Sequence, residues 1–222
     1  MDLWLWSLDD QDLLRRVSTL LSQDERSRAS RFVHKLHQDR FTTGRGRLRE
    51  ILGGYLDRAP EDLAFRYAEN GKPSLAAPSP VRFNLSHTEG VAALTVAHDI
   101  EIGVDIEGLR PVERDLPNHY FSAPEREELA KSPDDAWLGA FHRCWTRKEA
   151  IIKALGDGLS IPLDSFAVTL TPGAPARLLW RAGFPDAAER WVLAHFEGKG
   201  FVGAVAAETG GAPLSINLRS TS

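Results

Sequence analysis

Short apolar runs alternate with longer segments of helical periodicity along this chain. Leu3-Trp4-Leu5-Trp6 is apolar at every position and short, which is typical of a strand buried on both faces. The pattern from Asp9 to Leu56 is helical. Strands are then predicted at Val81–Leu85, Val91–Ala97 and Ile100–Ile106. The first half of the chain therefore combines helices with several short strands.

The second half repeats this mixture. Ser122-Ala123-Pro124-Glu125 is a capping box that opens a helix, with proline tolerated in the first turn. A long helix is expected from a cap at Asp134 or Asp135 to about Leu155, where Gly156 and Gly158 supply the positive φ angles that end helices. Further strands are expected near residues 166–170, 177–180, 191–195 and 201–207, and Asn70-Gly71-Lys72-Pro73 predicts a turn.

A weak internal repeat links the two halves. His87-Thr88-Glu89-Gly90 leads into one apolar strand, and His195-Phe196-Glu197-Gly198 leads, two residues later, into another. We infer an α+β fold of two similar halves, each a small, mainly antiparallel sheet packed with helices. The halves are expected to span residues 1–105 and 106–222, with the active site in the cleft between them. A chance similarity of two glycine-led strands remains open.

Composition narrows the class of protein. The chain has 222 residues, of which 42% are hydrophobic and 26% charged, as in ordinary globular proteins. A net charge of −4 argues against wholesale nucleic-acid binding. Asp2 and the lack of a long apolar run argue against a secretory signal and a membrane span. The single cysteine, Cys144, allows no internal disulfide, so we expect a cytoplasmic protein.

Charge is unevenly distributed. From Arg15 to Glu50 there are ten Lys or Arg residues against four Asp or Glu residues. This segment is either a set of solvated helix faces or a basic wall for an anionic ligand, and both interpretations stay open at this point.

Two carboxylates mark the strand that follows residue 100. In Gly103-Val104-Asp105-Ile106-Glu107, alternation places Asp105 and Glu107 on one face, with Val104 and Ile106 facing the core. Carboxylates two strand steps apart, roughly 7 Å, can share a hard cation such as Mg2+. A solvated strand face is the simpler interpretation of this pattern taken alone.

Two further polar patterns accompany the carboxylates. Trp145, Glu149 and Lys153 are spaced by four residues and form one stripe on the long helix, although a Glu–Lys pair at this spacing is also common on helix surfaces. Asn84-Leu85-Ser86-His87 ends a predicted strand, where backbone N–H groups and polar side chains can hold phosphate oxygens. A histidine in such a place is also often structural.

These three segments, in this order, resemble the three signature motifs of the 4′-phosphopantetheinyl transferase superfamily. The chain length and the suspected duplication resemble its monomeric Sfp-type branch, and the resemblance covers most of residues 26–165. It implies an Mg2+-dependent transferase that moves the 4′-phosphopantetheine group from coenzyme A to a serine of an apo acyl or peptidyl carrier protein. Such an enzyme releases adenosine 3′,5′-bisphosphate and serves fatty-acid, polyketide or nonribosomal-peptide synthesis.

The resemblance also implies roles for single residues. Asp105, Glu107 and Glu149 match the family's Mg2+ ligands. Glu149 is the implied base, directly or through a metal-bound water, and Lys153 is implied to stabilise or protonate the leaving group. The residues implied to contact coenzyme A are Arg45, Lys72, Asn84, Ser86, His87, Lys148 and Lys153.

Some features depart from the family pattern or stay open. Glu25 lies where some relatives carry a basic residue, which puts the nucleotide contacts there in doubt. The segment from Leu109 to Phe121, where the family recognises its carrier protein, contains no diagnostic motif. A protein that binds coenzyme A without transferring it, and a different Mg2+-dependent nucleotide enzyme, remain as alternatives. We expect a monomer with no nucleic-acid or membrane partner.

Overall fold

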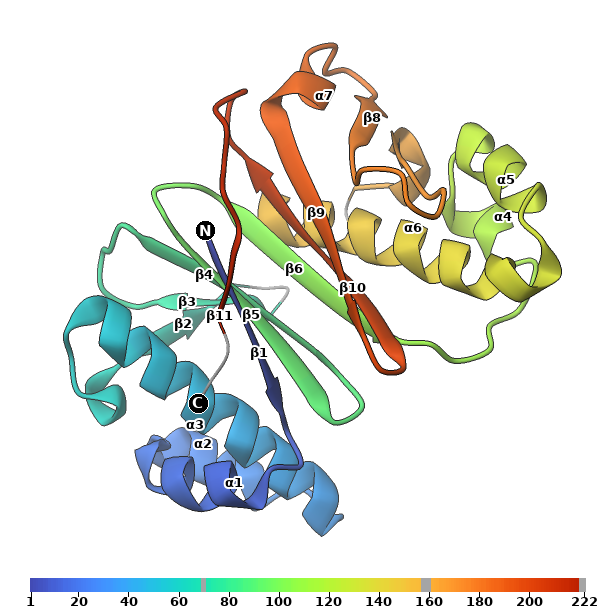
Figure 1. The fold of residues 1–222 in the computed structure, drawn as a ribbon. Helices are drawn as coiled ribbons and strands as arrows, with labels where there is room; N and C mark the ends of the chain where they lie inside the picture. Colours follow the sequence, from blue (N-terminus) through green and yellow to red (C-terminus); the bar gives the residue numbers. More distant parts are fainter. Residues whose placement is uncertain (69–70, 157–160, 220–222) are drawn as a thin grey trace.

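Two sheets, antiparallel except for the parallel pairing of their outermost strand β11 with β1, meet at the centre of the computed structural model, which describes residues 1–68, 71–156 and 161–219. Helix α3, with α1 and α2 beside it, lies on the outer side of one sheet, and α6 lies on the outer side of the other, with α4 and α5 beside it (Figure 1). The strands are β1 (Asp2–Ser7), β2 (Phe65–Tyr67), β3 (Pro73–Leu75), β4 (Val81–Thr88), β5 (Val91–His98), β6 (Ile102–Gly108), β7 (Phe166–Val168), β8 (Leu178–Arg181), β9 (Trp191–Gly198), β10 (Phe201–Glu208) and β11 (Asn217–Arg219). The helices are α1 (Gln11–Val17), α2 (Gln23–Ala29), α3 (Lys35–Leu56), α4 (Pro117–Tyr120), α5 (Ala123–Ala130), α6 (Asp134–Leu155) and α7 (Ala187–Arg190).

The helical pattern of residues 9–56 corresponds to three helices. Asp10 caps α1, since its carboxylate accepts the backbone N–H groups of residues 12 and 13. Ser22 and Glu25 form a capping box that begins α2. Helix α3 ends at Asp57, which adopts the left-handed conformation. Periodicity therefore predicted the helical content of this segment but not its two interruptions.

In the second half, several predicted boundaries are confirmed and others are wrong. The capping box of Ser122 and Glu125 opens α5, and Gly156, at φ 80°, ends α6. The cap of α6 is Pro133, whereas Asp134 and Asp135 lie in its first turn, where negative charge favours the helix dipole. Gly158 and Asn70 lie outside the described residues. The short hairpin strands β2 and β3 and the C-terminal strand β11 were not predicted.

The two sheets repeat one arrangement, as expected. The first sheet has the order β11-β1-β5-β4 and the second the order β6-β10-β9, so β1-β5-β4 corresponds to β6-β10-β9. The tight turns at Gly90 and Gly200, both at positive φ, occupy equivalent hairpins. The predicted repeat is thus real, and its strands 91–97 and 201–207 correspond as expected. The four-residue segments before them are offset by two residues, because Gly90 corresponds to Gly200 rather than to Gly198.

The hydrophobic core follows these layers. One cluster lies between α3 and the first sheet, another between α6 and the second, and a third, with Leu3, Val104 and Ile106, joins the inner faces of the two sheets. All of β6 pairs with β10, so the predicted boundary after Asp105 falls inside a strand. Among the described residues, no helix is long and apolar enough to cross a membrane.

Candidate active site

Helix α6 lies directly against β6 at Gly103. A Cβ atom on Gly103 would come within 2.0 Å of the backbone oxygen of Ala150 and 2.5 Å of the backbone nitrogen of Ala154. Only glycine allows this approach. Because side chains alternate along a strand, Asp105 and Glu107 share the face of β6 that looks toward α6. The predicted placement of these carboxylates is confirmed.

Lys153 of α6 reaches the first of these carboxylates. Its Nζ donates to Asp105 Oδ1 at 2.6 Å and to Ser86 Oγ at 2.9 Å, and the Ser86 hydroxyl donates to the same oxygen at 3.1 Å. The other oxygen, Asp105 Oδ2, is buried without a hydrogen-bond partner among the described residues. Because buried polar atoms are nearly always partnered, this oxygen is suited to receive a ligand.

Glu149 and Glu107 complete a group of negative charges. Burial raises the pKa of Glu149, and the charges of Asp105 and Glu107 raise it further, against the opposing effect of Lys153. Burial also raises the pKa of Glu107, where Asp105 adds to the effect and Arg110 and Lys153 oppose it. Three carboxylates thus face one lysine, so the site carries an excess of negative charge.

This donor set fits Mg2+ in its chemistry. The side chains supply only oxygen ligands, one of which is the partnerless Asp105 Oδ2, and Mg2+ binds through a few carboxylates together with water and substrate phosphate. As placed, the described residues contain no group of three or more His, Cys, Asp or Glu that could by itself hold a metal ion. The assignment of Asp105, Glu107 and Glu149 as metal ligands therefore stays a prediction.

Strand β4 is joined to β6 by side chains instead of a backbone ladder. Asn84 Oδ1 accepts the backbone N–H of Val104 at 2.8 Å, and Thr88 Oγ1 accepts that of Gly108 at 2.9 Å. Ser86, between them, donates to Asp105. We call Asn84, Ser86 and Thr88 the polar seam. These hydrogen bonds hold β6 against the first half. The Asn84 side chain therefore makes a structural contact, and its predicted contact with coenzyme A stays a prediction.

A cleft of about 710 Å³ opens beside the carboxylates. We call it the main cleft. Its polar lining comes from both halves and includes Arg28, Arg40, Arg45, Tyr67, His87, Glu89, Glu107 and Arg110. Burial lowers the pKa of His87, and the nearby charge of Lys153 lowers it further, so the neutral imidazole is favoured. The structure thus brings His87, Ser86, Glu107 and Lys153 together, as the sequence predicted.

Lys72 lies on the other side of Lys153. Its Nζ donates to the backbone oxygen of Lys153 at 2.6 Å, and it lines a second cavity of about 520 Å³. Burial lowers the pKa of Lys72, although the charge of Glu101 opposes this effect. Lys72 is therefore close to the site without lining the main cleft.

Lys148 does not belong to the site, which corrects the sequence-based assignment. Its side chain is fully buried, pairs with Glu125 at 2.8 Å, and donates to the backbone oxygens of Leu163 and Phe166, both at 2.7 Å. A lysine one position before Glu149 lies about 100° around the helix. This rotation points Lys148 into the core of the second half rather than toward the pyrophosphate.

Both interpretations of the basic segment hold in part. Several of its cations are neutralised within the protein: Arg15 by Asp12, Arg16 and Arg47 by Glu50, Lys35 by Asp39, and Arg40 by Asp9. Arg28, Arg40 and Arg45 nevertheless line the main cleft. Part of the segment is thus an ordinary helix surface, and part is a basic wall.

Sequence reasoning missed Gly103, Thr88 and Tyr67 as contributors to the site. The alternation of polar residues at positions 84, 86 and 88 was a readable signal for the polar seam. The close approach at Gly103 and the position of Tyr67 depend on how helices pack on strands, and no local pattern reports this.

Comparisons with known proteins agree with this geometry. Residues 101–206 match the family described as the 4′-phosphopantetheinyl transferase superfamily, and residues 5–99 match the family described as 4′-phosphopantetheinyl transferase, N-terminal. The chain is 42% identical over 182 residues to 4′-phosphopantetheinyl transferase HetI of Nostoc sp., covering 79% of this chain and 76% of that protein. It is 31% identical over 160 residues to 4′-phosphopantetheinyl transferase Sfp of Bacillus subtilis, covering 72% and 71%.

A solved structure is also similar in part. The Chronobacterium ammoniagenes ACPS–CoA complex shows 15% identity over 49% of this chain and 95% of that chain, with a TM-score of 0.38. A likeness of this size supports no further argument.

Proposed function

Because this chain belongs to the 4′-phosphopantetheinyl transferase superfamily and is a transferase of phosphopantetheine to carrier proteins, we propose that its donor is coenzyme A, its metal Mg2+ and its acceptor a serine of an apo acyl or peptidyl carrier protein. The observation that carries this proposal is the group formed by Asp105, Glu107, Glu149 and Lys153 beside the main cleft. A protein that only binds coenzyme A needs neither a base nor a partner for a leaving group.

The bond changes define what the residues must do. The serine oxygen attacks the phosphorus that carries the pantetheine arm, and the bond from this phosphorus to the adenosine-side phosphate breaks. The serine loses its proton, and adenosine 3′,5′-bisphosphate leaves. A serine hydroxyl is a weak nucleophile until a base takes this proton.

Glu149 is the proposed base, acting directly or through a water molecule. Burial and the charges of Asp105 and Glu107 raise its pKa, which makes its carboxylate a stronger proton acceptor near neutral pH. Lys153 is one turn further along α6, and its ammonium group stabilises the negative charge that develops on the leaving group.

Asp105, Glu107 and Glu149 are the residues that would hold Mg2+. When bound, Mg2+ would offset the charge of the diphosphate as the bond to the leaving group breaks. Arg45 and His87 line the cleft for the nucleotide part of coenzyme A, and Ser86 holds Asp105 and Lys153 in register. A chain that joins both halves of the cleft can act as a monomer.

Intact-mass spectrometry of an apo carrier protein tests the proposal. The carrier is incubated with this protein, coenzyme A and Mg2+, and in parallel with a chelator in place of Mg2+. We expect a gain of roughly 340 Da, one phosphopantetheine, only where Mg2+ is present. If neither acyl-type nor peptidyl-type carriers gain mass while coenzyme A binds, the protein is a binding module and the proposal fails.

A further inference from the structure

Two buried carboxylates occupy equivalent places in the two halves. Glu25 closes the capping box of α2 and pairs with Arg49 of α3, with Arg49 Nε 2.6 Å from its Oε2. Glu125 closes the capping box of α5 and pairs with Lys148 of α6 at 2.8 Å. In each half the cation also donates to backbone oxygens and lies over a phenylalanine ring at the start of the next strand. In each half, Oε2 of the carboxylate thus accepts the backbone N–H of the helix-capping serine and pairs with a buried cation of the following long helix.

The second oxygen is used differently. Oε1 of Glu125 accepts the backbone N–H of Val168 at 2.8 Å. Oε1 of Glu25 lies 3.2 Å from Nε of a second arginine, Arg45, which lines the main cleft. In the second half, the position of Arg45 is taken by the buried Cys144, since each lies twelve residues before the left-handed residue that ends its long helix. The extra ion pair is therefore confined to the half that carries the basic wall.

Arg45 is held in place and still has donors to spare. Its guanidinium lies over the rings of Phe65 and Tyr67, at 5.4 and 5.5 Å from their centroids, and donates to the Tyr67 hydroxyl. Its Nε is buried and makes no hydrogen bond with the described residues. Because Nε faces Glu25 and one terminal nitrogen donates to Tyr67, the remaining N–H donors of the two terminal nitrogens are the ones left for a ligand.

We propose that Glu25 is a positioning residue, which orients the Arg45 guanidinium at the wall of the main cleft to bind the 3′-phosphate of coenzyme A. The inference rests on the proposed function. The reacting diphosphate must lie next to Glu149 and Lys153, so the remaining phosphate, on the ribose, must meet other cations. Arg40 is already held by the Asp9 carboxylate in two hydrogen bonds of 2.6 and 2.8 Å. Arg28 also lines the cleft, with its guanidinium 5.3 Å from the centre of the Phe41 ring. Arg45 differs from it because Glu25, Phe65 and Tyr67 hold its guanidinium in one orientation while donors stay unused, which suits a phosphate oxygen.

The proposal also accounts for the unusual acid at position 25. A carboxylate in a nucleotide-binding region would repel phosphate if it faced the ligand. Glu25 is only 5% exposed and does not line the main cleft. It sits behind Arg45, where its charge orients the guanidinium without meeting the ligand.

Paired ligands test the inference in direct binding and in turnover. Calorimetry and transfer kinetics are measured with coenzyme A and with 3′-dephospho-coenzyme A for wild type, Glu25→Gln and Tyr67→Phe. We expect Glu25→Gln to raise Kd and KM for coenzyme A about tenfold, and Tyr67→Phe about threefold, because each loosens a charge-assisted contact. Both variants should bind 3′-dephospho-coenzyme A within about twofold of wild type, with kcat little changed, since this ligand has no 3′-phosphate for Arg45 to bind.

Two controls distinguish a loss of Arg45 orientation from a general loss of folded structure. Glu50→Gln removes a carboxylate from the same helix layer, where it pairs with Arg16 and Arg47, so it should affect neither ligand. Glutamine at position 25 keeps an oxygen for Ser22 and Arg49 but leaves the buried Arg49 charge without its carboxylate, so ligands are compared only under conditions where urea unfolding shows this variant to be folded. Tyr67→Phe tests Arg45 without this cost, because the half-exposed Tyr67 can lose its hydroxyl without loss of packing and takes no part in the Arg49–Glu25 pair. Equal losses with both ligands, or no loss with coenzyme A, would overturn the inference. Absence of transfer by wild type would instead sink the proposed function and leave the binding comparison intact.

Discussion

The two halves of the molecule share one frame, but only the second carries the carboxylates and the lysine that we propose act in the reaction. Trp4 and Asp105 are equivalent, because each pairs with the residue four positions after the hairpin glycine, Gly90 or Gly200. By the same register, Trp6 corresponds to Glu107. The face that presents carboxylates in the second half thus presents two tryptophans to α3 in the first.

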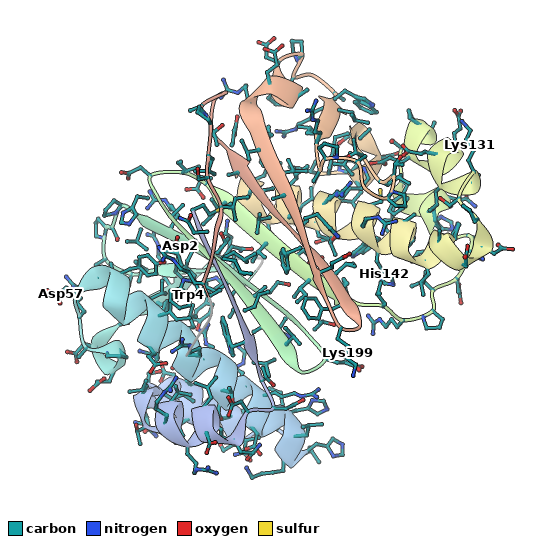
Figure 2. The ribbon with its side chains drawn as sticks, viewed as in Figure 1. Asp2, Trp4, Asp57, Lys131, His142 and Lys199 are labelled. Atoms are coloured by element: carbon teal, nitrogen blue, oxygen red, sulfur yellow. The ribbon has the colours of Figure 1, made fainter. Side chains whose placement is uncertain are left out.

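The two halves also differ in how closely the long helix approaches the strand beneath it, which is α3 on β1 in the first half and α6 on β6 in the second. Asp2 is equivalent to Gly103, and Tyr55 to Ala154. In the first half the Tyr55 hydroxyl donates to Asp2, and Trp4 donates its indole N–H to Tyr55 at 3.1 Å, so side chains fill the gap. Asp2 and Trp4 are labelled on β1 in Figure 2. In the second half, the backbone of α6 presses onto Gly103. The close approach of α6 to β6 in the second half lets Lys153 of the helix reach Asp105 of the strand.

The largest expected contrast is between Glu149 and its counterpart Glu50, each seven residues before the left-handed residue that follows its helix. Glu149→Gln should lower kcat for transfer by about 10²- to 10⁴-fold, the usual contribution of a general base. Glu50→Gln, which touches only Arg16 and Arg47, should leave transfer within about twofold of wild type under the same assay. Transfer kinetics with one apo carrier measure both.

A binding measurement separates the proposed role of Glu149 as a metal ligand from its proposed role as a base. Calorimetric titration of each variant with Mg2+ and coenzyme A shows whether Glu149→Gln weakens metal-dependent binding. Unchanged turnover in Glu149→Gln would remove Glu149 from both proposed roles and erase the contrast between the halves.

The next contrast concerns stability, and it is carried by Glu125. Both members of the Lys148–Glu125 pair are at most 1% exposed. Glu125→Gln leaves the Lys148 charge without a counter-ion in the core, which should cost about 3–5 kcal/mol in the free energy of unfolding. Replacing both residues, Glu125→Leu with Lys148→Met, should recover much of this loss. Urea unfolding measures both variants, and a loss under 1 kcal/mol for Glu125→Gln would contradict the assignment of Lys148 to the core.

The sequence predicted the parts of this comparison that local patterns can report. Alternation placed Asp105 and Glu107 on one face, and helical spacing aligned Glu149 with Lys153. The same spacing could not tell that Lys148 turns inward, because its orientation depends on Glu125, 23 positions away in the chain. The two strands of the repeat were matched correctly, but the glycines before them were matched two residues out of register, since matching letters near His87 and His195 outweighed the turn positions that fix a hairpin.

Gly103 gives a smaller effect that tests the helix approach itself. Gly103→Ala places a methyl group against backbone atoms of Ala150 and Ala154, which cannot rotate away. Such overpacking typically costs about 1–3 kcal/mol, and α6 must shift from β6 to relieve it. We expect a lower free energy of unfolding and a fall in kcat that exceeds any change in KM for coenzyme A. A fully active and equally stable variant would show that the close approach is not needed for the site.

The smallest expected effect lies in the first half, at Tyr55. Burial raises the pKa of Tyr55 to about 12, and its hydrogen bond to Asp2 adds to the shift. Because the folded-state pKa lies above the ordinary value of 10, the protonated phenol stabilises the fold below pH 10, and this contribution is lost as the pH rises toward 12. Since the side chain is only partly buried, we expect a loss of about 1 kcal/mol in the free energy of unfolding rather than the full value of the pKa shift.

Urea unfolding of wild type and Tyr55→Phe at pH 8.5 and 11.5 tests this, with Tyr67 and Tyr120 unchanged in both proteins. The wild type should lose more stability over that interval than the variant, because phenylalanine has no proton to release. Equal losses would mean that the Asp2–Tyr55 contact does not support the first half, and that its wider spacing between helix and strand is set by the tryptophans alone.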